Sequence, residues 1–470
     1  MGNSTKSLAV IVGVHLPKVS DQDFHGSLKE LTRLVTTLGY EVIGEVTQKR
    51  NSDQTATLLG EGKLKELALW TGGTGKVSSV VEVKLSKAAQ RWADEKSASL
   101  EELEDTTVSD VGEDSNQTQL VSEDLQGKAQ IVIVDTDLSP SQIRNLESAS
   151  GVKVLDRTGV IIEIFSRHAK TRAAKLQVEV ARLTYVAPRL RETGGGEDRG
   201  GGGVGGKGAG ESSLELDKRK IRDRIKELKA EIAAIGNEHQ VRRARREKEK
   251  TVALVGYTNA GKSSLMRALT GSEVLVQDKL FATLDTTIRP LIPESVPRIL
   301  VSDTVGFIKK LPHDLVASFK STLDEALNAS LLLFVVDASD DSFRSQLEVT
   351  QKVLAEVGAT DVPSLFVLNK QDQLDSAQMQ SLMKEFPDAI FISTRNPEDI
   401  KKLREKVLTY FQENFIEEDL FIPYTAKGVI GEIRSRLVVV SESYTEQGVN
   451  FRVKGSEENI AKVKTKVNFI

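Results

Sequence analysis

The amino-acid sequence predicts a multidomain α/β protein with four parts. These are an N-terminal parallel α/β domain, an antiparallel two-helix hairpin, a P-loop nucleotide-binding domain and a small C-terminal α+β domain. Three observations support this prediction. Strands alternate with helices early in the chain, a glycine-rich stretch separates two amphipathic helices, and a phosphate-loop signature directly follows a strand. The length of 470 residues is sufficient for several domains.

Composition is typical of a globular protein without a membrane span. Hydrophobic residues make up 39% of the chain and charged residues 28%, and no apolar run is long enough to cross a bilayer. No signal-peptide core follows the first residues, and Lys6 stands where a myristoylation signal needs Ser or Thr. The absence of cysteine excludes disulfides and thiolate metal sites. We therefore expect a cytoplasmic protein, with a monomer as the default.

The predicted N-terminal domain spans residues 1–165. Its strands are expected at Leu8–Val14, Tyr40–Val46, Ile131–Asp135 and from Val152 to Leu155, with helices between them. Such alternation indicates a parallel sheet.

An acidic segment interrupts this domain. Residues 91–126 hold eleven acidic side chains against two basic ones. We interpret about 71–127 as a flexible insert, because such a composition buries too little apolar surface to fold.

Residues 166–250 are predicted to form the helical hairpin. Apolar residues recur at helical spacing before Pro188 and again after a glycine-rich loop at 193–210. The apolar positions are Leu176, Val180, Leu183, Val186, Leu214, Ile221, Ile225, Leu228, Ile232 and Ile235. Residues 218–250 carry thirteen Lys and Arg against six acids. This block is either a solvated helix face or a nucleic-acid footprint.

The phosphate loop follows a strand at Val252–Val255 and precedes a helix. Its residues are Gly256, Tyr257, Thr258, Asn259, Ala260, Gly261, Lys262 and Ser263. In this G-x-x-x-x-G-K-S pattern the glycines let backbone N–H groups surround the phosphates. Lys262 then reaches the β- and γ-phosphates, and the Ser263 hydroxyl binds Mg²⁺.

A D-x-x-G motif ends the next predicted strand, Ile299–Ser302. It consists of Asp303, Thr304, Val305 and Gly306. Asp303 is placed to hold magnesium through water, and the Gly306 N–H can bond the γ-phosphate.

The base-reading motif N-K-x-D decides between ATP and GTP. It comprises Asn369, Lys370, Gln371 and Asp372, after a strand at Leu365–Leu368. The Asp372 carboxylate can accept hydrogen bonds from guanine N1–H and its exocyclic amine, which adenine cannot offer. Asn369 steadies the loop, and the Lys370 stem covers the purine. After a strand at Ala389–Ile392, a backbone N–H of Ser393, Thr394 or Arg395 is expected to meet guanine O6. Residues 251–415 thus read as a P-loop GTPase domain, a mixed sheet with flanking helices, whose substrate is GTP.

The first switch is expected between these motifs. The segment comprises Phe281, Ala282, Thr283, Leu284 and Asp285. A switch threonine joins magnesium, and Thr283, Thr286 and Thr287 are all candidates from spacing. Residues 416–470 read strand, helix, strand, turn, strand, helix, which indicates the small α+β domain.

The sequence resembles the HflX family of ribosome-associated GTPases over nearly its whole length. The residues that carry the resemblance are Gly44–Arg50, Leu138–Glu147, Val154–Ile161, Lys175–Val180, the glycine-rich loop, Phe281–Asp285 and Asp303–Ala317. The family pattern F-A-T-L-D implies that Thr283 is the switch ligand of magnesium. We therefore expect Lys262, Thr283 and Gly306 to act in hydrolysis. The long acidic insert is a departure from the family pattern.

The resemblance also implies a partner. Family members bind the large ribosomal subunit, split stalled ribosomes, and extend the glycine-rich loop toward ribosomal RNA near the peptidyl transferase centre. Arg189, Arg191, Arg199 and Lys207 around the loop agree with an RNA partner. The alternatives are an RNA-associated GTPase in ribosome assembly, a GTP switch with negligible turnover, and ATP-dependent RNA remodelling by the N-terminal domain. For ATP, Gly60–Lys63 is the one phosphate-loop-like element in that domain, and a plain turn into a helix explains it as well.

Turnover is expected to be slow without a partner. Many GTPases carry a Gln after the D-x-x-G glycine, where it orients the attacking water. Here that position is Phe307, which cannot form such a hydrogen bond. We expect ribosomes to stimulate hydrolysis.

Overall fold

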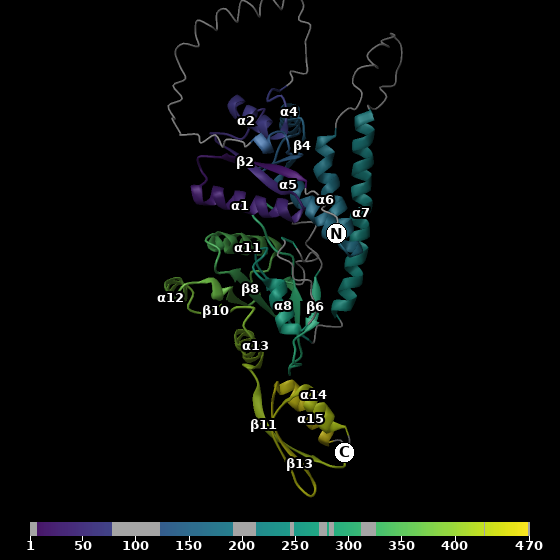
Figure 1. Cartoon of the computed structure of the whole chain (residues 1–470). Coiled ribbons are helices and arrows are strands. Elements are labelled where there is room, and N and C mark those ends of the chain that lie inside the picture. The colour runs from purple at the N-terminus through teal and green to yellow at the C-terminus, as the bar shows by residue number, and fades with distance from the viewer. Residues whose placement is uncertain are drawn as a thin grey trace, which may run out of the picture. The chain divides into compact units, whose positions relative to one another are not determined.

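The computed structural model describes eight stretches of the chain (Figure 1). They are residues 7–77, 123–190, 213–244, 249–271, 280–281, 286–311, 326–426 and 428–468. The chain divides into two compact units, Met1–Arg157 and Thr158–Ile470. None of the helices in these stretches has the length and apolar character needed to cross a bilayer.

The first unit is built on a four-stranded parallel sheet with the order β2-β1-β3-β4. Its elements are β1 (Leu8–His15), α1 (Asp21–Thr37), β2 (Glu41–Lys49), α2 (Glu61–Thr71), a 3₁₀ turn (Glu123–Leu125), β3 (Ile131–Val134), α4 (Pro140–Ser150) and β4 (Lys153–Asp156). The apolar strands β1 and β3 are central and buried, as an all-parallel sheet requires. Ser139 and Gln142 form a capping box at α4, which fixes where that helix begins.

Both ends of the predicted insert belong to this unit. Thr71 is the last residue of α2, and the Gly75 N–H donates to the Ala149 carbonyl at 2.9 Å. Val77 and Leu125 pack against the buried core. The prediction of a flexible segment from 71 to 127 was therefore too wide at both ends, and residues 78–122 lie outside the described residues.

A buried ion cluster lies at the carboxyl end of β3. Arg157 is 1% exposed, and its guanidinium donates to Asp135 at 2.6 Å and to Glu30. The Ser27 hydroxyl donates to the same Asp135 carboxylate at 2.6 Å. Buried charges persist in proteins when they are paired and hydrogen-bonded, as these are.

The Gly60–Lys63 segment forms the start of α2. The Gly60 N–H donates to Gln48 at 2.8 Å, and Lys63 pairs with Glu66 one turn along the helix. These contacts are those of a turn into a helix.

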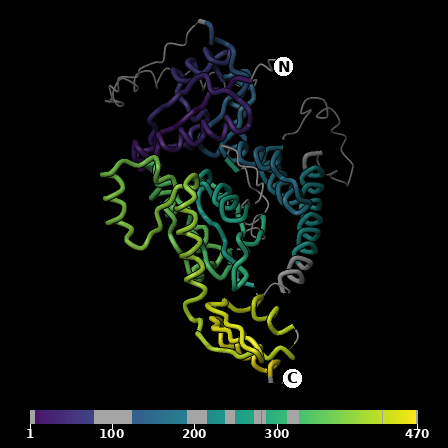
Figure 2. The backbone as a smooth tube through the Cα atoms, turned by 60° about the horizontal axis from the view of Figure 1, so that its bottom comes forward, coloured from purple at the N-terminus to yellow at the C-terminus, as the bar shows by residue number. Residues whose placement is uncertain are grey.

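The second unit begins with α5 (Arg157–His168), α6 (Arg172–Val186), a 3₁₀ turn (Ala187–Arg189) and α7 (Ser213–Ala244). Leu176 and Val180 of α6 pack on the buried Leu228 of α7. Ion pairs join Arg172 to Glu231 at 2.9 Å and Glu179 to Arg224 at 3.1 Å. Residue numbers rise along one helix as they fall along the other, so the pair is antiparallel (Figure 2). The glycine-rich loop lies outside the described residues.

A six-stranded sheet with the order β10-β9-β8-β5-β7-β6 follows. Its elements are β5 (Lys250–Val255), α8 (Lys262–Thr270), β6 (Thr287–Pro290), β7 (Ile299–Asp303), β8 (Leu331–Asp337), α11 (Phe343–Val357), β9 (Ser364–Asn369), α12 (Ser376–Glu385), β10 (Ile390–Phe391) and α13 (Pro397–Gln412). Only β6 is antiparallel to its neighbour among these strands, so the sheet is mixed. Strand β5 lies between β7 and β8, so the connection from β7 to β8 passes from one side of β5 to the other. The order of the strands reverses at such a point, and open α/β sheets bind their ligands there.

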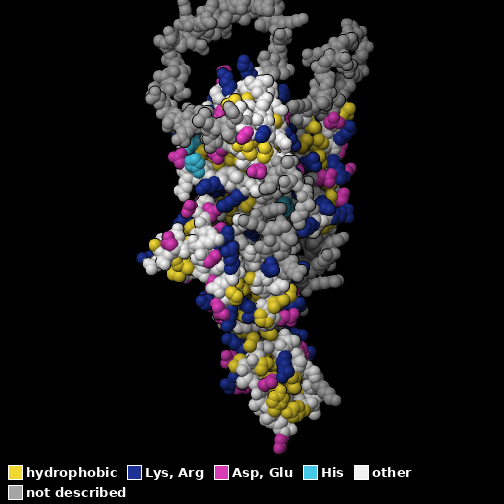
Figure 3. Space-filling model, in the orientation of Figure 1, with side chains coloured by type: hydrophobic (Ala, Val, Ile, Leu, Met, Phe, Trp, Pro, Cys, Tyr) yellow, Lys and Arg dark blue, Asp and Glu magenta, His cyan; other side chains and the backbone are white. Residues whose placement is uncertain are grey.

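The C-terminal part is a three-stranded antiparallel sheet with the order β11-β13-β12. Its elements are β11 (Ile416–Pro423), α14 (Val429–Arg436), β12 (Val438–Tyr444), β13 (Gly448–Gly455) and α15 (Glu457–Asn468). Apolar residues of the sheet and of both helices form a common core. Hydrophobic side chains are exposed on this part in Figure 3, and Phe421, Tyr424 and Tyr444 are between 47% and 63% exposed.

Candidate nucleotide site

The phosphate loop lies between the buried strand β5 and helix α8, and glycine is required at two of its positions. A Cβ on Gly256 would stand 2.1 Å from the Val335 carbonyl of β8. A Cβ on Gly261 would stand 2.2 Å from the Asn369 amide, and its φ of +96° disfavours other residues. The loop is thus packed closely against the neighbouring strands β8 and β9.

Lys262 is buried within this loop. Its ammonium donates to the carbonyls of Gly256 at 3.0 Å and Tyr257 at 2.7 Å. Burial lowers the pKa of Lys262 to about 8, although the nearby Asp303 carboxylate acts in the opposite direction. A desolvated cation gains when an anion approaches it, so this position suits a phosphate.

Ser263 and Asp303 meet at the ends of α8 and β7. The Ser263 hydroxyl donates to the Asp303 carboxylate at 2.8 Å, and Asp303 is fully buried. A hydroxyl and a carboxylate in contact supply the hard oxygen donors that magnesium prefers, and a buried carboxylate gains from a nearby cation. The residues present therefore fit Mg²⁺.

The D-x-x-G segment lies directly against the phosphate loop. The Thr258 N–H donates to the Phe307 carbonyl at 2.8 Å, and the Phe307 N–H donates to the Gly256 carbonyl at 3.1 Å. The Lys309 N–H also donates to the Tyr257 hydroxyl at 2.6 Å. A Cβ on Gly306 would approach Thr258 Cα to 2.9 Å. Any side chain at this position would collide with the phosphate loop, so glycine allows the two segments to lie in contact.

The predicted base-reading residues are held together by Asn369, which is 1% exposed. Its amide donates to the Ala260 carbonyl at 2.9 Å and accepts from the Thr394 N–H at 3.2 Å. Three segments distant in sequence thus meet at one side chain. Lys370 has a φ of +62° and pairs with Asp337 at 2.5 Å. The Asp372 carboxylate and the Arg395 guanidinium form an ion pair, with Oδ2 and Nη1 3.7 Å apart.

Some predicted site residues have side chains that pack in the core. Others lie outside the described residues. The Thr304 hydroxyl donates to the Leu254 carbonyl at 2.7 Å, and Val305 is buried. Phe281 is 3% exposed and its ring meets that of Phe165 edge-on, with centroids 4.5 Å apart. Ala282–Asp285, with the predicted switch ligand Thr283, lie outside the described residues.

Three family descriptions match the chain in order. A "GTP-binding GTPase N-terminal" region matches residues 25–110 and 98–166, a "GTP-binding GTPase Middle Region" matches 168–246, and a "50S ribosome-binding GTPase" matches 251–370. The GTPase HflX of Gluconacetobacter diazotrophicus is 55% identical over 97% of both chains. The chain belongs to the HflX family of GTPases. It is a GTP-binding enzyme that hydrolyses GTP.

More distant HflX relatives cover most of the chain as well. The GTPase HflX of Caldanaerobacter subterraneus is 36% identical over 96% of this chain and 91% of its own. That of Escherichia coli is 33% identical over 90% of this chain and 87% of its own. The family resemblance predicted from sequence motifs is confirmed.

Two acidic residues beside the predicted HflX-family motifs were not predicted from sequence. Asp337, at the end of β8, pairs with Lys370, and Asp399, in the first turn of α13, contacts Gln371 and Ser393. Neither belongs to a recognisable spacing pattern. The one feature of the sequence that could have indicated a role for Asp337 is its position at the end of a strand that precedes the strand ending in N-K-x-D.

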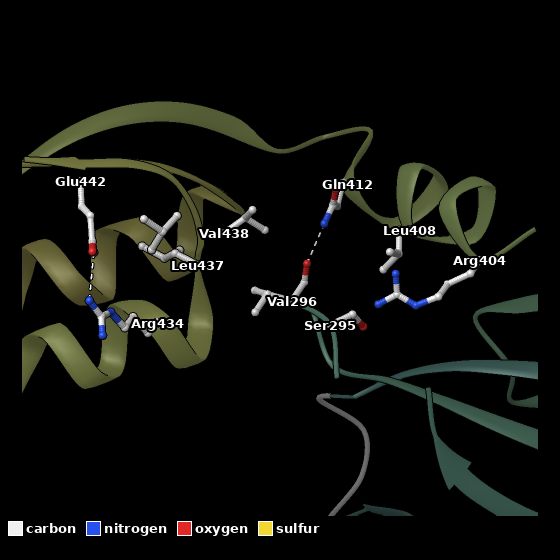
Figure 4. Close-up of a pocket in the computed structure, with 10 residues that line it drawn as sticks. Ser295, Val296, Arg404, Leu408, Gln412, Arg434, Leu437, Val438 and Glu442 are labelled. Carbon is white, nitrogen blue, oxygen red and sulfur yellow. Dashed lines mark hydrogen bonds and ion pairs between the residues drawn. The ribbon is translucent and has the colours of Figure 1, made fainter. Parts of the chain in front are cut away.

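A cleft of about 660 Å³ lies elsewhere in the second unit, between α13 and the C-terminal sheet (Figure 4). Arg404 and Gln412 of α13 line one side. Arg434 and Glu442 line the other and form an ion pair at 2.9 Å. No residue of the predicted nucleotide motifs lines this cleft, so the loops around Asn369 and Lys262 remain the candidate site.

Proposed function

We propose that this GTPase binds the large ribosomal subunit and uses GTP to split or rescue stalled ribosomes in the cytoplasm, acting as a monomer. The family description that matches residues 251–370 is of a 50S ribosome-binding GTPase. The observation that carries the proposal is the antiparallel pair of α6 and α7. Because the helices run antiparallel, the end of α6 and the start of α7 are neighbouring helix ends, and the sequence between them is rich in glycine.

An excess of positive charge supports an RNA partner, since residues 218–250 carry thirteen Lys and Arg against six acids. Some of the charge on α7 is balanced, since Arg224 pairs with Glu179 and Glu227. Figure 3 likewise shows side chains of both signs interspersed on the face it draws. Arg189 lies at the end of α6 toward the loop, and its guanidinium stacks over Tyr185 at 3.7 Å. Arg and aromatic groups are common partners of single-stranded or looped RNA.

The phosphate loop, the first switch and the D-x-x-G motif are assigned to the phosphates and to magnesium. Backbone amides of the loop from Gly256 to Gly261 surround the phosphates, and Lys262 pairs with their β- and γ-oxygens. Ser263 and Thr283 would hold magnesium, with Asp303 acting through water. When bound, the ion neutralises charge that develops on the phosphate oxygens. The Gly306 N–H donates to the γ-phosphate.

The base side of the site is assigned to two segments, Asn369–Asp372 and Ser393–Arg395. Asp372 accepts from guanine N1–H and the 2-amino group, while the second segment donates to O6. Asn369 supports both segments through its contacts to Ala260 and Thr394. A site with polar groups matched to guanine rejects adenine strongly.

Deletion of residues 194–208 tests the ribosomal role of the loop. We expect GDP and GTP affinity to be unchanged, because the nucleotide motifs begin at Gly256. We expect the variant to lose splitting of vacant ribosomes, followed on sucrose gradients with GTP and with a non-hydrolysable analogue. Normal splitting by the deletion variant would show that the loop is a linker.

Single-turnover rates test the dependence of hydrolysis on the ribosome. Phe307 is 3% exposed, and its side chain offers no polar atom to a water molecule. We expect an intrinsic rate on the order of 10⁻⁴–10⁻² s⁻¹. Large subunits should raise it by roughly 10²-fold, about 2.7 kcal/mol of barrier. A rate without subunits that already matches the rate with them would contradict the proposal.

Co-sedimentation separates this proposal from its alternatives. Wild-type protein should pellet with mature large subunits in GTP and less in GDP. Binding restricted to immature particles would favour a role in subunit assembly. ATP binding by the N-terminal domain is tested with ATP in place of GTP.

A further inference from the structure

Asp399 is a buried acid beside the base-reading segments. Helix α13 begins after Asn396, whose side chain caps it by accepting the Glu398 N–H at 3.1 Å. Asp399 follows in the first turn and is only 5% exposed. A carboxylate so far from water needs donors, and the structure shows where they come from.

One oxygen of Asp399 joins the two base-reading segments. Its Oδ2 accepts the Ser393 N–H at 2.8 Å and the side-chain amide of Gln371. Gln371 stands between Lys370 and Asp372 in the N-K-x-D motif. The Gln371 N–H also donates to the Ile392 carbonyl at 3.1 Å, so the segments are tied by backbone as well.

This connection complements the one made by Asn369. Asn369 fixes the start of the N-K-x-D motif against Ala260 and Thr394. Asp399 fixes the next part of the motif against Ser393. Together the two side chains set the distance between the segment that faces guanine N1–H and the segment that faces O6. The Asp399 charge also lies at the N-terminus of α13, where the helix dipole favours an anion.

We propose that Asp399 is a positioning residue for guanine recognition, because its carboxylate holds Ser393–Arg395 in register with Asn369–Asp372. This inference rests on the base-reading roles proposed above. It predicts that losing Asp399 weakens selection at both edges of the base, although Asp399 does not touch the base. A helix-stabilising acid would instead change folding stability and leave base selection unchanged.

The test uses the full chain, with GDP, IDP and 6-thio-GDP as probes. IDP lacks the 2-amino group that Asp372 reads, and 6-thio-GDP replaces O6 with a weaker acceptor. We expect Asp399→Ala to lose roughly tenfold to hundredfold in GDP affinity, as for a buried hydrogen-bond network opened at one side. The wild-type preferences for GDP over IDP and over 6-thio-GDP should both shrink by at least about threefold.

Three further variants make the result specific. Asp399→Asn keeps one carbonyl oxygen that can accept both donors, so its GDP affinity should stay within about fivefold of wild type. Gln371→Met removes one donor at similar side-chain length and should give an intermediate loss. Glu398→Ala removes the neighbouring exposed acid of the same helix turn and should leave affinity and base preference within about twofold.

Two outcomes would overturn the inference. One is an Asp399→Ala variant that binds GDP weakly but keeps both wild-type base preferences. The other is an Asp399→Asn variant as impaired as Asp399→Ala, which would assign the effect to charge rather than to the two hydrogen bonds. If Asp399→Ala does not fold, Gln371→Met decides alone, and unchanged preferences there overturn it. Failure of Asp372→Asn to alter base choice would instead reject the proposed guanine site.

Discussion

Replacing Asp372 with Asn should move base preference from guanine toward xanthine. Guanine presents two donors, N1–H and the 2-amino group, and a carboxylate can accept both. An amide offers one acceptor and one donor, so its NH₂ would face the 2-amino group of guanine. Xanthine carries an oxygen at that position, to which the amide can donate. The same substitution should therefore weaken GDP binding and strengthen XDP binding.

The surroundings of Asp372 set the size of the effect. Its side chain is 36% exposed, so water would weaken the charge-assisted hydrogen bonds that we assign to it. Losing one such bond and opposing two donors should cost about 2–4 kcal/mol, or roughly 30-fold to 1,000-fold in GDP affinity. The ion pair with Arg395 is a minor contributor. That guanidinium is 83% exposed and 3.7 Å away, and exposed pairs contribute less than about 1 kcal/mol.

Equilibrium titration of GDP, XDP and ADP against both proteins measures the change. The control is Arg395→Gln, which breaks the ion pair and keeps the carboxylate, and it should alter GDP affinity by less than about fivefold. Retention of the wild-type preference for GDP over XDP by Asp372→Asn would refute the assigned role of this carboxylate.

Two further substitutions test the phosphate side and the N-terminal domain. Ser263→Ala should make GDP release much less sensitive to removal of magnesium by EDTA, while Ser264→Ala should behave as wild type; unchanged EDTA sensitivity in Ser263→Ala would exclude it as a ligand. Arg157→Met should destabilise the N-terminal unit by about 3–5 kcal/mol in urea unfolding, because it leaves the buried Asp135 and the partly buried Glu30 without the guanidinium. Arg167→Met removes an exposed pair with Glu163 and should cost less than about 1 kcal/mol, so equal losses would show that burial of the cluster is unimportant.

Periodicity and local motifs predicted most of the secondary structure. The strand predicted at Leu8–Val14 is β1, and the helix predicted to end before Pro188 is α6, which ends at Val186. These elements are signalled by runs of neighbouring residues, apolar strands and helix-stop signals. The strand predicted at Tyr40–Val46 extends to Lys49, because its later residues pair with β1 up to His15. The residue at which such a strand ends is set by its pairing with a distant segment, which a local pattern does not record.

The two clusters of buried polar side chains, around Arg157 and around Asp399, were not predictable in the same way. Arg157 lies in a segment that carries the family resemblance, but its partners are Ser27, Glu30 and Asp135, far away in sequence. Asp399 likewise reads as an ordinary acid in the first turn of a helix. Both roles arise when the fold brings together residues that have no fixed spacing. Single-sequence patterns record spacing, so they identify motifs such as the loop around Lys262 and miss side chains such as Arg157 and Asp399, whose partners come from distant segments.

We infer from the arrangement of hydrogen bonds that guanine recognition and turnover are separable. On the base side, Asn369 and Asp399 join the loops through buried side chains. On the γ-phosphate side, the D-x-x-G segment meets the phosphate loop through the two backbone bonds of Phe307 and the Tyr257 hydroxyl. At Gly306, to which we assign the γ-phosphate contact, a Cβ would stand 2.9 Å from Thr258 Cα, so the two segments lie in close contact there. If a partner such as the ribosome shifts the D-x-x-G segment, we expect the rate of hydrolysis to change, while the buried hydrogen bonds on the base side keep the preference for guanine.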